Sequence, residues 1–310
     1  MRFITAALLT LLTAPARAEN GSSGAAFLLR PLGARAAAMG QAAVSLPAKT
    51  ADGLLFNPAS TIYISSRTAS ADYLRGYADD STGFAAFAAP LGGIVLTPAI
   101  FYYNAGTMNL NLSNGTRGTV TAEEDTMLIA AASAKPLKFL AVGAAFKYWS
   151  SSLAQSATAR GTSWDIGAMA ELPYGFMAGA ALQNAGGSIK YEDVSDPAPL
   201  TQRLGFCWRG KINGHKIDST SDFSDIDFTA ATDYSKTLGE DGYFQSGVEI
   251  GMKPGDEMYF ALRAGYMFGR EVQTATFGAG VEQSGWGLDY GYGGARELPA
   301  LHQFTLSRKF

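Results

Sequence analysis

The amino-acid sequence predicts an all-β fold: a transmembrane antiparallel β-barrel of about fourteen strands, with a small N-terminal hatch, or plug, that contains short helices. Three observations lead to this prediction. The chain begins with the pattern of an export signal, divides from residue 67 onward into segments of alternating apolar and polar residues, and ends on an aromatic residue. The domains expected are a signal peptide over 1–18, the hatch over 19–66 and the barrel over 67–310.

The N-terminus has the three parts of a secretory signal. Met1 and Arg2 supply a short positive region, residues 3–14 are apolar, and residues 16–18 (Ala-Arg-Ala) give the small-x-small pattern that signal peptidase recognises. As a helix, residues 3–14 span only about 18 Å, less than the ~30 Å hydrocarbon core of a bilayer, which disfavours a membrane anchor. We therefore expect cleavage after Ala18 and export of the mature chain.

Segments of about ten residues with period-two alternation follow one another through the rest of the chain. In 257–268, for example, Phe260 and Leu262 share one face and Arg263 lies on the other. Ten residues at ~3.3 Å each, tilted by about 40°, cover about 25 Å, the height of the apolar band of an outer-membrane barrel. The expected strands are 68–78, 83–90, 94–103, 126–134, 138–149, 162–172, 175–184, 201–210, 225–234, 243–252, 257–268, 274–282, 285–292 and 301–310.

Parts of the sequence also fit two other folds, a membrane-spanning helix and a soluble β-sandwich. Residues 83–103 are uncharged and long enough for a membrane-spanning helix, but Pro90 and Pro98 would each cost such a helix about 3 kcal/mol in its interior. Two strands joined by a tight turn at residues 91–93 account for the same residues better. A soluble β-sandwich also alternates apolar and polar residues. The export signal, the glycine-rich polar face with its opposite charges, and the aromatic C-terminus favour the membrane barrel.

The lengths of the connections indicate which end of the barrel is which. The connections at 91–93, 135–137, 173–174, 253–256 and 283–284 are short, as periplasmic turns are, and those at 104–125, 150–161 and 185–200 are long, as outer loops are. Residues 211–224 are the exception, a long inner connection that contains Asn213-Gly214, a hairpin signal. An extra hairpin there would change the strand count by two.

Charged residues alternate onto the glycine-rich face, which we expect to line the lumen because a charge on the lipid face costs ~2–4 kcal/mol at mid-depth. We expect them to form a salt-bridged lining that braces the hatch, with a polar conduit as the alternative. The inward apolar residues expected are Gly and Ala, which are too small for a wide hydrophobic tunnel. The lumen-facing charges expected are Lys147, Asp165, Glu171, Arg203, Arg209, Asp227, Glu249, Arg263, Glu282 and Asp289, together with Asp225 and Asp233.

Aromatic residues are expected at the membrane interfaces, and one set of apolar residues is expected to direct assembly. Phe304, Leu306 and Phe310 share one face of the last strand, and this pattern resembles the terminal strand that the barrel-insertion machinery binds by strand pairing. Rings with a polar edge suit the headgroup boundary. The residues expected in the interface girdles are Tyr102, Tyr103, Tyr148, Trp149, Trp164, Trp208, Trp286, Tyr290 and Tyr292.

The composition argues against catalytic and nucleic-acid-binding functions. The formal charge is −3 and no basic run is present, which gives no reason to expect nucleic acid as a partner. The single cysteine, Cys207, cannot form an internal disulfide. Neither histidine, His215 or His302, lies in a local Ser-His signature, and the sequence has no nucleophile elbow, metal-ligand spacing or phosphate loop. We expect no enzyme activity, catalytic residues, metal or cofactor.

Several stretches of the chain resemble the PorV/PorQ family, which belongs with the FadL-like outer-membrane proteins. They are Gly33-Ala34-Arg35 with Met39-Gly40, LFNPA at 55–59, the segments 180–205 and 247–266, and the closing strand 302–310. The resemblance covers nearly the whole mature chain. It implies a fourteen-stranded barrel with residues 19–66 as a hatch inside or beneath the lumen, and a hatch motif of Gly33, Arg35, Gly40, Asn57 and Pro58. The chain departs from the family at Phe56, where Trp is common, and keeps only Asp52 of an upstream acidic pair.

The resemblance also suggests functions. It implies a bacterial outer-membrane protein that acts in protein export or surface attachment, as in type IX secretion, as a binding or shuttle component. The implied partners are outer-membrane lipid, the barrel-insertion machinery, and secretion components or exported cargo proteins. The alternatives are a FadL-like, hatch-gated transporter of hydrophobic small molecules and a structural outer-membrane protein. A direct contact between Asn57 and a substrate is the less favoured interpretation of the hatch motif, whose residues we expect to pack the plug.

Overall fold

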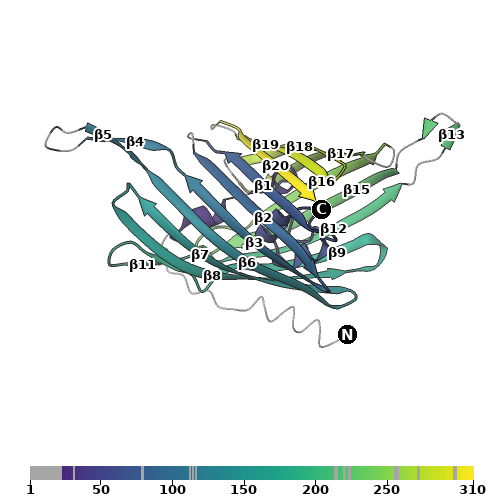
Figure 1. Cartoon of the computed structure of the whole chain (residues 1–310), viewed down its shortest axis with the longest axis horizontal. Helices are drawn as coiled ribbons and strands as arrows, with labels where there is room; N and C mark the ends of the chain where they lie inside the picture. The colour runs from purple at the N-terminus through teal and green to yellow at the C-terminus, as the bar shows by residue number, and fades with distance from the viewer. Residues whose placement is uncertain are drawn as a thin grey trace.

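The computed structural model of the chain is a closed barrel of fourteen antiparallel strands, which confirms the predicted fold class and strand count (Figure 1). It describes residues 23–30, 32–77, 80–111, 113, 115, 117–212, 216–218, 221–222, 225–254, 258–270, 273–295 and 299–310, so the predicted signal peptide lies outside the described residues. The wall consists, in order, of β1 (Thr68–Arg75), β2 (Ser81–Leu91), β3 (Ile94–Asn104), β6 (Glu123–Leu137), β7 (Leu140–Leu153), β8 (Ala157–Glu171), β9 (Phe176–Ala185), β12 (Thr201–Ile212), β15 (Asp225–Thr237), β16 (Tyr243–Lys253), β17 (Met258–Phe268), β18 (Gln273–Gln283), β19 (Trp286–Ala295) and β20 (Leu301–Lys309).

Period-two alternation gives the wall its two faces, as predicted. On β17, Leu262 is 60% exposed on the outer surface, and its neighbour Arg263 is 6% exposed on the inner one. The same division holds on β16, where Val248 and Ile250 face outward and Glu249 faces the lumen. An apolar outer surface around a polar interior is the arrangement that hydrocarbon lipid requires.

The uncharged segment 83–103 forms the hairpin of β2 and β3, as predicted. Its two turn residues, Gly92 (φ 58°) and Gly93 (φ 105°), both have positive φ, which glycine adopts without steric cost and which tight hairpin turns require. None of the helices within the described residues is long and apolar enough to cross a bilayer.

Three two-stranded hairpins lie outside the wall. The pair β4 (Thr107–Asn111) and β5 (Arg117–Thr121) and the pair β10 (Ser188–Lys190) and β11 (Ser195–Pro197) belong to the long loops. The pair β13 (Lys216–Asp218) and β14 (Ser221–Asp222) belongs to the long connection between β12 and β15. This connection therefore holds a hairpin, which adds no strand to the barrel. The predicted turn, Asn213-Gly214, precedes β13 in the sequence and lies outside the described residues, so it is not the connection between β13 and β14. Below, the end with the long loops is called the loop end and the opposite one the turn end.

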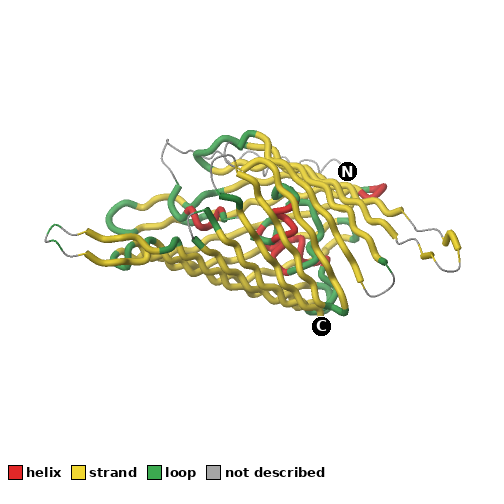
Figure 2. The backbone as a smooth tube through the Cα atoms, turned by 90° about the horizontal axis from the view of Figure 1, so that it is seen from above, coloured by secondary structure: helices red, strands yellow, loops and turns green. Residues whose placement is uncertain are grey.

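The hatch lies within the ring of strands (Figure 2). Its elements are η1 (Ala26–Leu29), α2 (Ala34–Ala38), η2 (Ala51–Leu55) and η3 (Pro58–Tyr63), and a further short turn, η4 (Pro173–Gly175), connects β8 to β9. Asn57 caps η3 by accepting a hydrogen bond from the backbone N–H of Ala59, and Pro58 occupies the first helical position, where a missing N–H costs nothing. The helix α2 packs against β17–β20, and η3 packs against β6–β8.

Glycines in the wall are placed where the hatch backbone approaches it. A Cβ atom at Gly265 on β17 would lie 2.2 Å from the backbone nitrogen of Gly40, and one at Gly143 on β7 would lie 2.4 Å from that of Ala59. Any side chain at these positions would force the hatch off the wall. The high glycine content therefore serves the packing of the hatch as well as the crowding of neighbouring strands.

Candidate functional site

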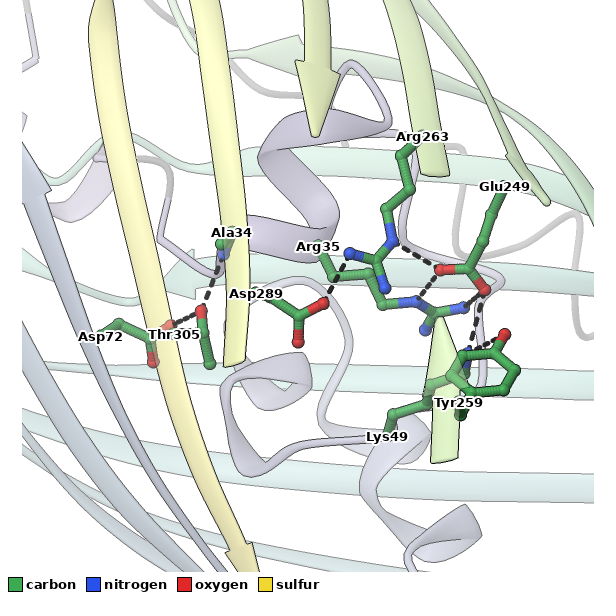
Figure 3. A network of polar contacts seen from close by, with 9 residues as sticks. All are labelled: Ala34, Arg35, Lys49, Asp72, Glu249, Tyr259, Arg263, Asp289 and Thr305. Carbon is green, nitrogen blue, oxygen red and sulfur yellow. Dashed lines mark hydrogen bonds and ion pairs between the residues drawn. The ribbon is translucent and has the colours of Figure 1, made fainter. Parts of the chain in front are cut away.

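The carboxylate of Glu249 on β16 binds two hatch side chains on one side of the lumen (Figure 3). The guanidinium of Arg35 on α2 donates from Nε to Oε2 at 2.8 Å and from Nη2 to Oε1 at 3.0 Å. Arg263 on β17 donates from Nε to Oε2 at 2.7 Å, and Lys49 of the hatch donates from Nζ to Oε1 at 3.1 Å. A bidentate guanidinium contact fixes orientation as well as distance. We call this carboxylate and the polar residues joined to it in Figure 3 the polar network.

The polar network extends along the wall in both directions from Glu249. Arg263 reaches with Nη1 to Asp289 on β19 at 2.5 Å, passing over Gly280 of the intervening strand, whose added Cβ would lie 2.1 Å from the Asp289 carboxylate. Lys49 also donates to the phenol oxygen of Tyr259 at 3.0 Å. Burial, together with the nearby charge of Arg35, lowers the pKa of Lys49 to about 8. Three cationic groups thus share two carboxylates.

A separate set of hydrogen bonds crosses the joint between the first and last strands (Figure 3). The backbone N–H of Ala34 donates to Thr305 Oγ1 at 2.9 Å, and the Thr305 hydroxyl donates to Asp72 Oδ1. Thr305 lies on β20 directly opposite Asp72 on β1. The three residues are almost completely buried, with exposures of 0% for Ala34, 1% for Thr305 and 5% for Asp72.

The hatch motif is placed against the wall. The Asn57 side chain is completely buried, and its amide donates to the carbonyls of Val44 (2.8 Å), Ala168 (3.2 Å) and Ala180 (3.4 Å). Since the side-chain oxygen accepts from Ala59, both polar atoms of Asn57 are engaged within the protein. Gly33 caps α2 at φ 96°, against the side chain of Asp52, which takes the place of a Gly33 Cβ. This geometry leaves no polar atom of Asn57 free for a substrate.

The other predicted lumen charges fall into two groups. Lys147 and Asp165 form a buried pair at 2.6 Å beneath the β10–β11 hairpin, and Lys147 also donates to Asn184 at 2.8 Å. Arg203 donates to the side chains of Gln183 and Ser235 toward the loop end, and Asp233 accepts from the backbone N–H of Val44. The rest lie toward the turn end in more open surroundings: Glu171 paired with Lys135, Glu282 with Lys309 and Asp225 with Lys211, and Arg209 and Asp227 near the start of the β12–β15 connection.

The opposite side of the lumen contains an apolar site that the sequence analysis missed. The ring of Phe27 on η1 lies 6.2 Å from the ring of Phe101 and 6.3 Å from that of Trp149, centroid to centroid. These residues belong to one buried cluster, and we call its inward-facing members around Phe27 the apolar cage. The apolar cage consists of Phe101 and Tyr103 on β3, Met127 and Ile129 on β6, Trp149 on β7, and Ile189 on β10.

The apolar cage corrects two predictions. Inward apolar residues are not limited to Gly and Ala, because Phe84, Phe101, Met127 and Trp149 all face the lumen and are at most 4% exposed. Tyr103 and Trp149 are likewise not part of an interface girdle. The signal that could have revealed this was present: in 94–103 and 126–134 both faces of the strand are apolar, and such a strand is buried on its second face too.

The loop end of the apolar cage is covered by the N-terminal segment and the β10–β11 hairpin. Arg30 stacks on the Tyr103 ring at 3.6 Å and pairs with Asp80, and the backbone N–H of Gly24 donates to Pro197 at 3.0 Å. The hairpin is held in turn by the hydrogen bond between Tyr191 and Ser151 at 2.6 Å. Residues 23–30 and 188–197 thus form one cover over the apolar cage.

The predicted assembly signal lies at the end of β20. Phe304 and Leu306 are 44% and 48% exposed on the outer surface, and Phe310 is 70% exposed. The Phe310 ring lies 6.4 Å from that of Phe87, and its backbone N–H donates to Arg67 at 2.9 Å. Recognition of Phe304, Leu306 and Phe310 by the barrel-insertion machinery stays a prediction.

The fold is FadL-like. No family model matches the chain, and no curated protein matches it in sequence. Among solved structures, the toluene transporter TbuX of Ralstonia pickettii superposes with a TM-score of 0.57 at 14% identity, over 92% of this chain and 100% of that one. A FadL homologue of Pseudomonas aeruginosa gives 0.54 at 12% identity, over 91% and 99%. The toluene transporter TodX of Pseudomonas putida gives 0.53 at 12% identity, over 89% and 96%. Membership of the PorV/PorQ family stays a prediction.

Proposed function

We propose that this protein is a channel of the bacterial outer membrane that admits small apolar compounds through a lumen closed at rest by the hatch. In this proposal the loop end faces outward, since short turns are typical of the periplasmic side. The protein carries out no chemical reaction. Its FadL-like fold supports this function because two of the similar structures are described as toluene transporters.

The observation that carries the proposal is the position of Phe27. Its side chain, a benzyl group, fills an enclosed apolar cage near the loop end, where a compound entering from outside would arrive. The residue belongs to a short 3₁₀ turn of four residues with no side-chain cap. The apolar cage is therefore suited to one aromatic ring, and the protein supplies that ring itself when no ligand is bound.

Exchange of Phe27 for a ligand is energetically reasonable. Burying an aromatic side chain of this size contributes roughly 1.5–3 kcal/mol, and a single-ring hydrocarbon taking its place would recover about the same amount. Displacement then costs mainly the contacts of the cover, such as the Arg30 pair with Asp80. An entering compound thus replaces one apolar occupant by another and exposes little apolar surface to water.

The β2–β3 ladder in the wall beside the apolar cage is interrupted at one point. The pairing of β2 with β3 is interrupted between Ala86↔Ala99 and Ala89↔Leu96, where Pro98 has no N–H to donate. A compound in the apolar cage therefore lies next to the least tightly paired part of the β2–β3 ladder. This supports passage of an apolar compound from the lumen toward the membrane.

Uptake of labelled toluene by cells that lack other hydrocarbon channels tests the proposal. We expect expression of the protein to raise toluene entry several-fold over an empty vector, leaving glucose entry unchanged. Phe27→Ala removes the internal occupant and raises toluene entry further. Phe277→Ala, which removes the same ring from the outer surface of β18, is the matched control and changes nothing. Toluene entry equal to the vector for both the wild type and Phe27→Ala would contradict the proposal and favour a structural role.

The role in protein export rests on the motif resemblance alone. The motif side chains of Arg35 and Asn57 are engaged in holding the hatch to the wall, so their presence is explained without cargo. No feature of the described residues favours export over the passage of apolar compounds.

A further inference from the structure

The joint between β1 and β20 turns an open sheet into a barrel, and it is short. β1 has eight residues and β20 has nine, whereas β7 and β8 have 14 and 15. Unpaired edge strands are prone to associate with other chains, so an exported barrel must join its first and last strands correctly. We infer that the hatch has a second function, independent of transport: it clamps this joint from inside the barrel through Ala34, Thr305 and Asp72.

The hydrogen-bond directions give the clamp its mechanism. The Thr305 hydroxyl has one proton, and the backbone N–H of Ala34 donates to its oxygen. The proton therefore points across the joint to Asp72 Oδ1, and the bond joins two side chains that are almost completely buried. The hatch thus orients a side-chain bond between two strands that the backbone ladder already pairs at this position.

The polar network anchors the clamp to the strands next to the joint. Arg35, the residue after Ala34, binds Glu249 on β16, and Arg263 links β17 to Asp289 on β19. Asp289 is in turn the register partner of Thr305 on β20. Two sets of polar contacts therefore lie side by side, one from β16 to β19 and one from β20 across to β1, and the hatch is bound to both.

Chain connectivity makes this arrangement useful during assembly. The hatch continues directly into β1, so a hatch docked on the last strands brings the first strand to the correct edge. The paired strands are far apart in sequence, separated by 233 residues between Asp72 and Thr305, and closing so long a loop is entropically costly. Docking of α2 against β17–β20 holds β1 near β20 and so reduces the number of conformations that the chain must sample before the two strands pair.

Hydrogen exchange of the β1 and β20 backbone amides in the folded, full-length mature protein tests the clamp. Thr305→Val keeps the shape and removes the hydroxyl, and we expect exchange at the joint to rise roughly tenfold, the effect of losing one buried hydrogen bond. Thr305→Ser keeps the hydroxyl and restores exchange to within about twofold of the wild type. The matched control is Thr97→Val on β3, which removes an inward hydroxyl with no hydrogen-bond partner, and it leaves the joint unchanged.

The outcomes are decisive in both directions. Failure to recover folded Thr305→Val while Thr305→Ser and Thr97→Val fold normally also supports the clamp, because closure itself is then impaired. Folded Thr305→Val with wild-type exchange at the joint overturns it. An equal rise in amide exchange at the joint in Thr97→Val also overturns the clamp, because loss of any inward hydroxyl would then have the same effect. Toluene uptake is not part of this test, so the clamp and the proposed channel can fail separately.

Discussion

The two sides of the lumen hold the hatch in different ways. Along β16–β20 and β1, the hatch is bound by directional contacts: the bidentate pair of Arg35 with Glu249 and the hydrogen bond from Ala34 to Thr305. Near the loop end of β3, β6 and β7, residues 26–29 of the hatch are bound by the apolar contacts of Phe27 in the apolar cage. Directional polar contacts fix one partner in one orientation, whereas apolar contacts accept any group of suitable size. In the proposed channel, the polar side is then the anchor and the apolar side is where ligands exchange.

The largest effect is expected where the anchor is broken. Glu249→Gln removes the charge that Arg35, Arg263 and Lys49 share, and leaving buried charges unpaired costs about 3–5 kcal/mol. Urea unfolding of the detergent-solubilised protein should show this loss. The matched control is Glu282→Gln, whose pair with Lys309 is one-third exposed and which should lose about 1 kcal/mol at most. Equal losses in the two variants would mean that Glu249 is not the anchor.

An intermediate effect is expected where the hatch backbone lies closest to the wall. Gly265→Ala places a Cβ within 2.2 Å of Gly40, and overpacking of this kind costs typically about 1–3 kcal/mol. Displacement of the hatch should also open a steady ion conductance in planar bilayers, which the intact protein should lack. Gly83→Ala on β2, where nothing lies within 4 Å of the added Cβ, is the control and should behave as the wild type. A Gly265→Ala protein with no ion conductance and with wild-type stability would contradict the close contact between Gly265 and Gly40.

The smallest effect is a pH dependence. Because the pKa of Lys49 in the folded protein is lowered to about 8 from its ordinary value of 10.5, the unfolded chain binds more protons between those values. The free energy of unfolding should therefore rise as pH increases from about 8 to about 10.5, by a modest amount since the side chain is 36% exposed. Lys49→Met removes this titration. The difference in the free energy of unfolding between the wild type and Lys49→Met across that pH range therefore gives the contribution of Lys49. If the free energy of unfolding of the wild type instead falls relative to that of Lys49→Met over this range, the burial of Lys49 is contradicted.

The wall could be predicted from the sequence because its rules are local. A period of two in 257–268 puts Leu262 on one face and Arg263 on the other. The export signal, the glycine-rich polar face with its opposite charges and the aromatic last residue together indicated which face is outside. Short turns such as 91–93 then set the strand count. The β12–β15 connection was also marked by its length, although its hairpin adds nothing to the wall.

The candidate sites depend on contacts that no local pattern contains. Arg35 and Glu249 are 214 residues apart, and nothing in the spacing of either residue identifies the other as its partner. The apolar cage was missed for a different reason. Trp149 and Tyr103 were assigned to interface girdles, whereas the second apolar face of these strands packs against a hatch segment more than 70 residues away in sequence.

Hydrogen exchange of the hatch, measured with and without saturating toluene, compares the two sides of the lumen in one molecule. We expect toluene to raise amide exchange several-fold in residues 24–30, whose Phe27 is displaced, and to leave amide exchange in residues 34–40 unchanged. An equal rise in both segments, or a rise confined to 34–40, would contradict the assignment of a fixed polar anchor and an exchangeable apolar side.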